Sequence, residues 1–333
     1  MNWLRPRAVP WVVVVALLAG ACAPMVRSAG PAVGVPHFDG SDLVTADGLA
    51  LPMRRWLPED EADPPAAVVV ALHGFNDYSA AFDAPGRFLA ARGIAVYAFD
   101  QRGFGEAPER GRWAGSATMA ADLDDMLRLV AARHPGVPLY VLGESMGGAV
   151  ALVALALPDH PPIQGVILAA PAVWARDDMS LLQRSALWLA AHTVPWLTLT
   201  GEGLHITASD NLEMLRRMSR DPLVIKETRV EAIHGLCDLM DDAMTAAPAL
   251  ALPTLVLVGD HDEVVPAEPV WRMVKTLPGT PVVARYANGY HMVLRDLDAD
   301  LVLTDVATWI ADPARSLPSA ADRRAAADPG AAP

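Results

Sequence analysis

A serine stands between glycines at the junction of two apolar runs. The stretch G-E-S-M-G, residues 143–147, follows the apolar run 139–142 and begins a helix-like run that extends to 157. In a G-x-S-x-G pattern the serine lies on a sharp strand-to-helix turn, where neighbouring backbone comes too close for a Cβ on the glycines. The turn presents the hydroxyl of Ser145 at a helix N-terminus, whose free N–H groups suit a developing oxyanion. The pattern predicts a nucleophile, although a glycine-rich turn with an incidental serine reads the same.

A serine hydroxyl needs a base, and the base needs an orienting acid. In enzymes built on this turn the chain order is serine, acid, histidine. Three carboxylates compete for the role of acid after the apolar run 254–258, namely Asp260, Asp262 and Glu263. The candidate base is His291, which follows the run 282–286. Both groups follow predicted strand ends, where open α/β sheets place their sites.

Two further loops follow strand ends. In H-G-F at 73–75 the backbone N–H of Phe75 is expected to complete an oxyanion hole with that of Met146. His73 is expected to hydrogen-bond the turn itself. The loop D-Q-R-G-F-G at 100–105 is expected to shape the site without taking part in chemistry.

No metal and no cofactor are expected. His261 has two aspartates beside it, but one histidine among loop carboxylates is a poor ligand set. The net charge of -13 argues against a nucleic-acid partner, because proteins usually bind nucleic acid through clustered Lys and Arg.

Short apolar runs bounded by turns predict the sheet that positions these residues. Because nearly every residue within these runs is apolar, the sheet should be buried on both faces. Helical stretches alternate with the runs, the clearest being 117–134 with Ser116 as its N-cap. Such alternation predicts an α/β fold with a mostly parallel sheet. Asp47-Gly48 within 43–57 predicts a hairpin. The six runs are 67–72, 94–99, 139–142, 165–169, 254–258 and 282–286.

The segment 174–248 interrupts this rhythm. It holds no convincing strand, is rich in helix formers and falls between two predicted strands, so it is interpreted as an inserted helical cap. Three of its apolar residues are expected to bind substrate, namely Trp188, Trp196 and Leu197. They would form an apolar funnel that holds an acyl chain and that touches the membrane surface. Ordinary packing of the cap onto the core is the alternative for most apolar residues here.

These motifs together resemble the α/β-hydrolases, and more closely the monoacylglycerol lipase and lysophospholipase-like group of serine aminopeptidase S33 type. The resemblance covers residues 37–311. It implies a central, mostly parallel sheet with helices on both faces, and an acid placed third after glycine in a G-x-x-D pattern, which is Asp262. Glu144 stands where the animal lipases carry histidine, and Gln101 and Phe104 stand where the family often shows histidines. These departures leave the mechanism intact and the substrate open.

The resemblance implies a serine hydrolase that cleaves carboxylic esters of lipids through an acyl-enzyme on Ser145. Monoacylglycerol and lysophospholipid are the expected substrates. One alternative is a general carboxylesterase or thioesterase for short soluble acyl groups. Another is a non-catalytic lipid-binding lipoprotein, against which the complete triad speaks.

The N-terminus predicts export. Residues 1–22 combine arginines, a short apolar run and small residues before Cys22, which resembles a bacterial lipoprotein signal whose cysteine is lipidated. This predicts a lipid-anchored protein of the cell envelope, at the periplasmic or outer-membrane face. An ordinary signal cleaved near Ala21 or Ala23, giving a secreted or periplasmic protein, is the alternative. Residues 23–36 are interpreted as a linker and 312–333 as a disordered tail.

Overall fold

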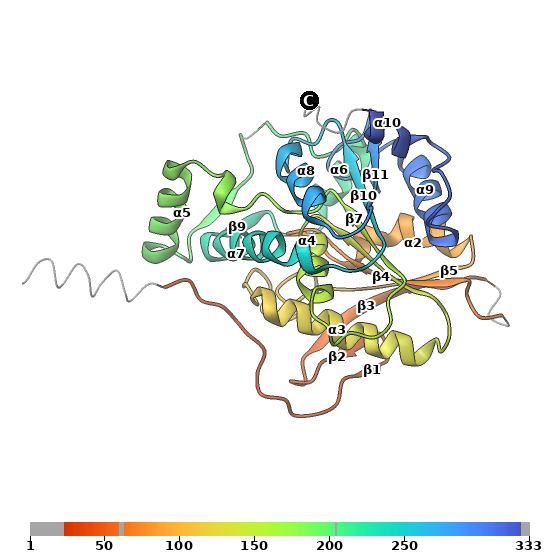
Figure 1. Cartoon of the computed structure of the whole chain (residues 1–333). Coiled ribbons are helices and arrows are strands. Elements are labelled where there is room, and N and C mark those ends of the chain that lie inside the picture. The colour runs from red at the N-terminus through yellow and green to blue at the C-terminus, as the bar shows by residue number, and fades with distance from the viewer. Residues whose placement is uncertain (1–22, 60–62, 204, 328–333) are drawn as a thin grey trace, which may run out of the picture.

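The computed structural model describes residues 23–59, 63–203 and 205–327, and its centre is a nine-stranded sheet (Figure 1). The strand order is β1-β2-β3-β5-β4-β6-β7-β10-β11. The six strands from β5 to β11 in this order run parallel, and β1, β2 and β3 add antiparallel pairs at one edge. The strands are β1 (His37–Asp39), β2 (Asp42–Val44), β3 (Ala50–Trp56), β4 (Ala67–Leu72), β5 (Ile94–Phe99), β6 (Leu139–Glu144), β7 (Gly165–Ala169), β10 (Thr254–Gly259) and β11 (Val282–Tyr286).

Helices cover both faces of this sheet because side chains alternate along each strand. In β4, Val68, Val70 and Leu72 enter one core and the residues between them enter the other. The first core is closed by α3 (Ser116–Arg133), α4 (Met146–Leu155), α7 (Val230–Ala246) and α8 (Ala267–Thr276), and the second by α2 (Asp83–Ala90), α9 (Ala299–Ala311) and α10 (Ala321–Ala327). Short 3-10 helices occur at Ser79–Phe82, Arg176–Asp178 and Ala247–Ala249.

The predicted α/β fold is confirmed, and each of the six apolar runs is a strand of the sheet. The hairpin at Asp47-Gly48 is also confirmed, because β2 and β3 pair antiparallel around a turn in which Gly48 has a φ of 79°. The predicted N-cap of α3 is wrong by one residue. Gly115 caps this helix with a φ of 89° and no side-chain bond, so that Ser116 is the first helical residue.

The insertion lies between β7 and β10, which are neighbours in the sheet. It contains α5 (Leu181–Thr193), α6 (Leu212–Arg220) and α7, and α5 projects furthest from the sheet (Figure 1). The expectation that it holds no strand is wrong, because β8 (Thr198–Thr200) and β9 (Glu227–Arg229) form an antiparallel pair. Each of these two strands has only three residues, all exposed or half-buried, so neither appears in the sequence as an apolar run. α7 packs on α3 and α4 in the helix layer, so the cap consists of residues 174–229 rather than the expected 174–248.

The two terminal segments differ from each other. Residues 23–36 form no helix or strand beyond a bridge of Val26 to Trp113, in keeping with a linker. The disordered tail expected for 312–333 is wrong as far as residue 327, because Leu317, Ala321 and Ala325 are buried and α10 packs beside β11. The burying residues are mostly alanines, which give weak apolar periodicity. The signal segment with Cys22 lies outside the described residues, and no described helix is long and apolar enough to cross a bilayer.

Candidate active site

Ser145 occupies a strained turn between β6 and α4. Its φ of 52° and ψ of -115° lie outside the regions that non-glycine residues favour. Gly147 is required here, because a Cβ on it would lie 2.2 Å from the carbonyl oxygen of Leu72 in the neighbouring strand. The predicted need for glycine in this motif is thus confirmed. The turn places the serine immediately before α4, at the N-cap position, and its side chain lines a cavity.

His291 is paired with a carboxylate. Its Nδ1 lies 2.8 Å from Oδ2 of Asp262, and both side chains are less than a tenth exposed. The other oxygen of Asp262 accepts hydrogen bonds from the backbone N–H groups of Val264 and Val265, at 2.8 and 2.9 Å. These bonds fix the carboxylate against the imidazole. Because Nδ1 faces Asp262, Nε2 is the ring nitrogen left to take a proton from a hydroxyl.

The other two candidate acids have different partners. Asp260 pairs with the guanidinium of Arg285 at 2.5 Å. Glu263 accepts a hydrogen bond from the backbone N–H of Thr207 at 2.6 Å. Of the three carboxylates that the sequence left in competition, only Asp262 is bonded to His291 in the described chain.

A second close approach brings the acid and histidine loops together. Gly259 ends β10 and Gly289 precedes the histidine, and a Cβ on Gly259 would lie 2.5 Å from the carbonyl group of Gly289. The N–H of His261 donates to the carbonyl of Gly289 at 2.9 Å. The two glycines therefore set the spacing of Asp262 and His291. In the sequence Gly259 marks the G-x-x-D pattern that selects Asp262, but its close approach to Gly289 is visible only in the structure.

The two expected oxyanion donors come from different elements. Phe75 follows β4, and Met146 is the first residue of α4, so its N–H has no partner four residues earlier in the helix. His73 holds the first of these loops, as expected. Its Nδ1 donates to the carbonyl of Gly74 at 2.8 Å, and its Nε2 accepts from the N–H of Gln101 at 3.0 Å. Burial lowers the pKa of His73, which agrees with this neutral tautomer.

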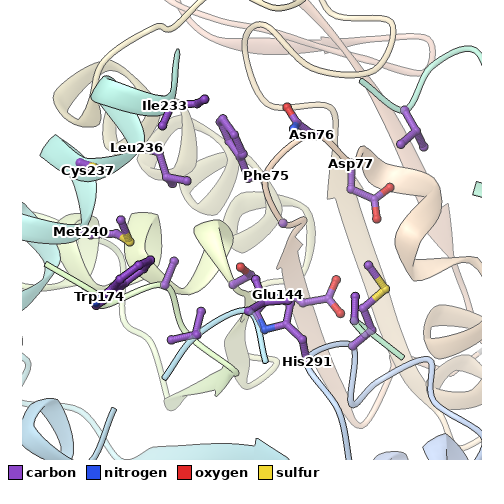
Figure 2. A pocket seen from close by; sticks show the side chains of 18 of the residues that line it. Phe75, Asn76, Asp77, Glu144, Trp174, Ile233, Leu236, Cys237, Met240 and His291 are labelled. Atoms are coloured by element: carbon purple, nitrogen blue, oxygen red, sulfur yellow. The ribbon is translucent and has the colours of Figure 1, made fainter. Parts of the chain in front are cut away.

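Ser145 and His291 face one cavity of about 580 Å³, which is apolar on one side (Figure 2). Trp174 and a stripe of α7 line the apolar side, while Asn76 and Asp77 lie on the opposite side with Glu144 and His291 between them. The α7 stripe is Ile233, Leu236, Cys237 and Met240. Its spacing of three, four and seven residues is a helical face visible in the sequence, but periodicity does not distinguish a cavity wall from a core contact.

The cap residues expected to bind substrate lie elsewhere. Trp188 and Trp196 are each 55% exposed and Leu197 is 47% exposed, and none of the three lines the cavity. They do not form the wall of this cavity, and their role in binding substrate stays a prediction. In α5 it is Gln183 and Leu187 that reach the cavity, because residues four apart lie on the same face of a helix. The outward face carries the tryptophan.

A buried ion-pair network stands beside Ser145. The guanidinium of Arg295 donates to Asp77 through Nη1 and to Glu144 through Nη2, both at 2.8 Å. Burial raises the pKa of Glu144, and Arg295 opposes this shift. Burial lowers the pKa of Arg295, but the two carboxylates outweigh it and leave the guanidinium firmly protonated. Sequence reasoning noted Glu144 as a departure and missed its partners, which lie in other loops.

No metal site accompanies these groups within residues 23–59, 63–203 and 205–327. There, no cluster of three or more His, Cys, Asp and Glu side chains is arranged to hold an ion. The arrangement consists of a hydroxyl, an imidazole with its carboxylate, and two backbone N–H groups. These are the parts needed for acyl transfer through a covalent intermediate.

Comparison with known proteins identifies a family and several relatives. The family model described as serine aminopeptidase, S33, matches residues 63–298. Monoglyceride lipase of Rattus norvegicus is 28% identical over 284 residues, which are 83% of this chain and 91% of the relative. Monoacylglycerol lipase of Mycolicibacterium smegmatis is 28% identical over 79% of this chain and 93% of its own. The crystal structure of Paleococcus ferrophilus monoacylglycerol lipase superposes with a TM-score of 0.66 at 23% identity, covering 78% of this chain and 98% of that one, which shows a shared fold.

Proposed function

The chain belongs to the serine aminopeptidase S33 family of α/β-hydrolases, and we propose that it is a carboxylic ester hydrolase of lipids. Its proposed substrates are monoacylglycerol or lysophospholipid. The observation that carries the proposal is the pairing of His291 with Asp262 in the same apolar cavity as Ser145. The similarity to the two monoacylglycerol-cleaving relatives supports a lipid ester as the substrate.

The proposed mechanism proceeds through an acyl-enzyme. Nε2 of His291 takes the proton of Ser145, whose oxygen attacks the ester carbonyl. The backbone N–H groups of Phe75 and Met146 stabilise the oxyanion, an effect worth about 3–4 kcal/mol for one donor in related enzymes. His291 then protonates the leaving alcohol as the carbon–oxygen bond breaks. The same histidine activates the water that releases the fatty acid, and Asp262 orients it in both steps.

The cavity supports a long acyl group rather than a short soluble one. Its volume of about 580 Å³ is within the usual range for a bound small molecule, and most of its lining is aliphatic, aromatic or sulfur-containing. An acyl chain that contacts these side chains is removed from water, and this stabilises binding by about 25 cal/mol for each Å² of apolar surface buried. The acyl chain is therefore assigned to the side formed by Trp174 and α7.

Fatty-acid release tests the function. Purified protein would be given monooleoylglycerol, oleoyl-lysophosphatidylcholine and p-nitrophenyl butyrate, each with Ser145→Ala as the control. Release from either lipid, lost in the variant, supports the proposal and identifies the head group. Activity on p-nitrophenyl butyrate alone would replace it by a short-chain esterase. Failure of a fluorophosphonate probe to label Ser145 would instead favour a non-catalytic lipid-binding protein.

We also propose that the protein works at a membrane, held by a lipid on Cys22 in a bacterial cell envelope. Leu181 and Leu182 are 78% and 79% exposed, and Trp188, Trp196 and Leu197 lie on the same cap. Exposed apolar side chains gathered in this way are typical of a surface that contacts lipid. Anchoring and cap contact should act together, so a Cys22→Ala variant that also carries Trp188→Ala and Trp196→Ala should lose activity on vesicles. Unchanged activity on long-chain lipid vesicles would remove this part of the proposal.

A further inference from the structure

The Glu144–Arg295–Asp77 network joins the three loops that carry the proposed reaction. Glu144 immediately precedes Ser145, Arg295 stands four residues after His291, and Asp77 stands two residues after Phe75. The side chains of Glu144, Arg295 and Asp77 are 3%, 9% and 7% exposed. One guanidinium therefore connects the serine turn, the histidine loop and the oxyanion loop inside the protein.

We propose that Glu144, Arg295 and Asp77 are positioning residues that hold these three loops in register and favour the imidazolium formed at His291 during acyl transfer. The inference rests on the proposed function, because it concerns the same serine, histidine and oxyanion donors. It adds two effects to that function. One is geometric and depends on the two-branched guanidinium, and the other is electrostatic and depends on the charge of the network.

The geometric effect follows from the shape of arginine. Its planar guanidinium binds Asp77 through one terminal nitrogen and Glu144 through the other, so the two carboxylates cannot shift independently. Asp77 is itself fixed, since its Oδ1 accepts from the N–H of Tyr78 at 2.9 Å. Lysine has a single ammonium group on a flexible stem and would not impose this spacing. A small error in spacing is costly in catalysis, because reacting atoms must be held in near-attack geometry.

The electrostatic effect follows from the charge count. Two carboxylates and one guanidinium give the network one net negative charge, in a buried place where charges are weakly screened. Glu144 and His291 line the same cavity and lie beside each other (Figure 2), so a positive imidazole favours the ionised carboxylate. By reciprocity the carboxylate favours the positive imidazole. Asp262 contacts His291 directly, and Glu144, Asp77 and Arg295 line the same cavity. From the neighbouring loops, Asp296 accepts a hydrogen bond from the N–H of Tyr290, and the His261 ring lies 5.2 Å from the ring of Tyr290.

The network is not arranged for greatest stability. Within the described residues, Oε1 of Glu144 and Nε of Arg295 are buried without any hydrogen-bond partner. Each such group loses its hydration on burial and gains no hydrogen bond in return. Buried ion pairs are in general poor contributors to stability compared with apolar side chains of similar size. Unpaired buried groups therefore favour a role in the reaction over a role in folding.

Two variants separate the geometric effect from the electrostatic one. Glu144→Gln keeps the shape and removes the net charge, whereas Arg295→Lys keeps the charge and removes the two-branched contact. Asp260→Asn is the matched control. It removes a carboxylate from the same edge of the sheet, but that carboxylate pairs with Arg285 and not with the network. Each would be assayed on p-nitrophenyl butyrate for kcat and KM across pH, and by the rate of fluorophosphonate labelling of Ser145.

Glu144→Gln should lower kcat about tenfold, with KM within about threefold, as expected for a group that acts in the transition state. The acidic limb of kcat/KM against pH should move to lower pH, because the imidazolium loses a favourable charge, by about half a unit to one unit. Arg295→Lys should lower kcat and the labelling rate by a similar factor and leave the acidic limb in place. Asp260→Asn should leave kcat, the labelling rate and the acidic limb unchanged.

The results distinguish failure of this inference from failure of the proposed function. If the unsubstituted protein neither hydrolyses the ester nor labels at Ser145, the proposed function fails and the inference with it. If the unsubstituted protein is active and folded Glu144→Gln keeps its kcat and its acidic limb, the inference alone is overturned. Should Glu144→Gln not fold, Asp77→Asn carries the same test, since it also removes one negative charge and leaves the Arg295–Glu144 pair intact.

Discussion

Ser145 keeps an unfavourable backbone conformation because its neighbours over-determine it. Strain of this kind costs about 1–3 kcal/mol. The N–H of Ser145 donates to Ala169 at 2.9 Å, and its carbonyl accepts from Ala172 at 3.0 Å and from Gly148 at 2.9 Å. These bonds tie the turn to the end of β7 and to α4. The hydroxyl is therefore placed by the sheet and its helix rather than by its own conformational preference.

At the residue scale, the pairing of His291 with Asp262 leads to a prediction that separates neighbouring acids. Asp262→Asn should lower kcat on ester substrates by about 10⁴-fold, because the amide no longer holds the imidazole in the tautomer that accepts a proton. Asp260 lies two residues before Asp262 but pairs with Arg285, so Asp260→Asn should change kcat by less than about threefold. Steady-state kinetics of the two variants, with circular dichroism to check folding, measure the difference. Equal losses in both variants would contradict the assignment of the acid.

At the element scale, long buried strands could be predicted from the sequence, and short exposed strands could not. Runs such as 67–72 are apolar because both faces of the sheet are covered, so the pattern reports the fold directly. β8 and β9 have three exposed or half-buried residues each, and their pairing depends on where the cap chain is led by α5 and α6. The candidate triad could be found because its members follow strand ends in a known order. The cavity wall could not, because a stripe such as that of α7 has the same period whether it faces a cavity or a core.

Filling the α7 side of the cavity should shorten the acyl chain that is accepted. Leu236→Trp adds bulk where the acyl chain is proposed to lie and should lower kcat/KM for monooleoylglycerol at least about tenfold. Activity on p-nitrophenyl butyrate should stay within about threefold, because a four-carbon acyl group does not extend along α7. Leu189→Trp is the control, since Leu189 is 57% exposed on α5 and lies outside the cavity lining. Equal loss on both substrates would place the acyl chain elsewhere.

The β2–β3 turn should stabilise the protein in a pH-dependent manner. Asp47 accepts from both terminal nitrogens of Arg102 at 2.7 Å, and these hydrogen bonds hold the pKa of Asp47 well below its ordinary value. A lowered folded-state pKa contributes stability that is present above the unfolded value, near pH 4, and is lost as the pH falls. Asp47→Asn should therefore lower the free energy of unfolding by about 1–3 kcal/mol at pH 7, and by progressively less below about pH 4.

Urea unfolding of Asp47→Asn and the unsubstituted protein between pH 3 and pH 7 measures this contribution. The comparison between the two proteins is needed because Arg102 also binds Asp122, whose pKa is raised by burial to about 6. That second carboxylate gives the opposite dependence, since ionising it between about pH 4 and pH 6 costs stability. Because the charge of Asp47 helps to raise the pKa of Asp122, Asp47→Asn should also move that pKa toward its ordinary value, so only the part of the difference that is lost below about pH 4 reports Asp47 itself. A stability difference that does not change with pH would show that Asp47 acts through neutral hydrogen bonds alone.

At the scale of the whole molecule, the C-terminal segment covers an edge of the sheet. β11 is the last strand in the order, and an edge strand presents backbone groups without a neighbouring strand. The guanidinium of Arg324 in α10 donates through Nε to the carbonyl of Arg285 in β11 at 3.1 Å. The buried carboxylate of Asp305 in α9 accepts from the N–H of Ser319 at 3.0 Å and from the hydroxyl of Tyr286. The segment beyond α9 is thus bonded both to the edge strand and to the helix beside it.

Removing this segment should destabilise the protein and expose an edge that pairs with other chains. A chain ending at residue 311 loses the buried Leu317, and a buried leucine is worth about 2–5 kcal/mol when truncated. The midpoint of thermal unfolding should therefore fall by at least about 5 °C relative to a chain ending at residue 327, which keeps α10. Light scattering on heating should rise earlier in the shorter chain, because the uncovered β11 can accept a strand from a second molecule. Leu317→Asp in the full chain should lower the midpoint in the same direction without removing the bonds to Asp305. Identical midpoints for the chains ending at 311 and 327 would mean that α10 rests on the sheet without supporting it.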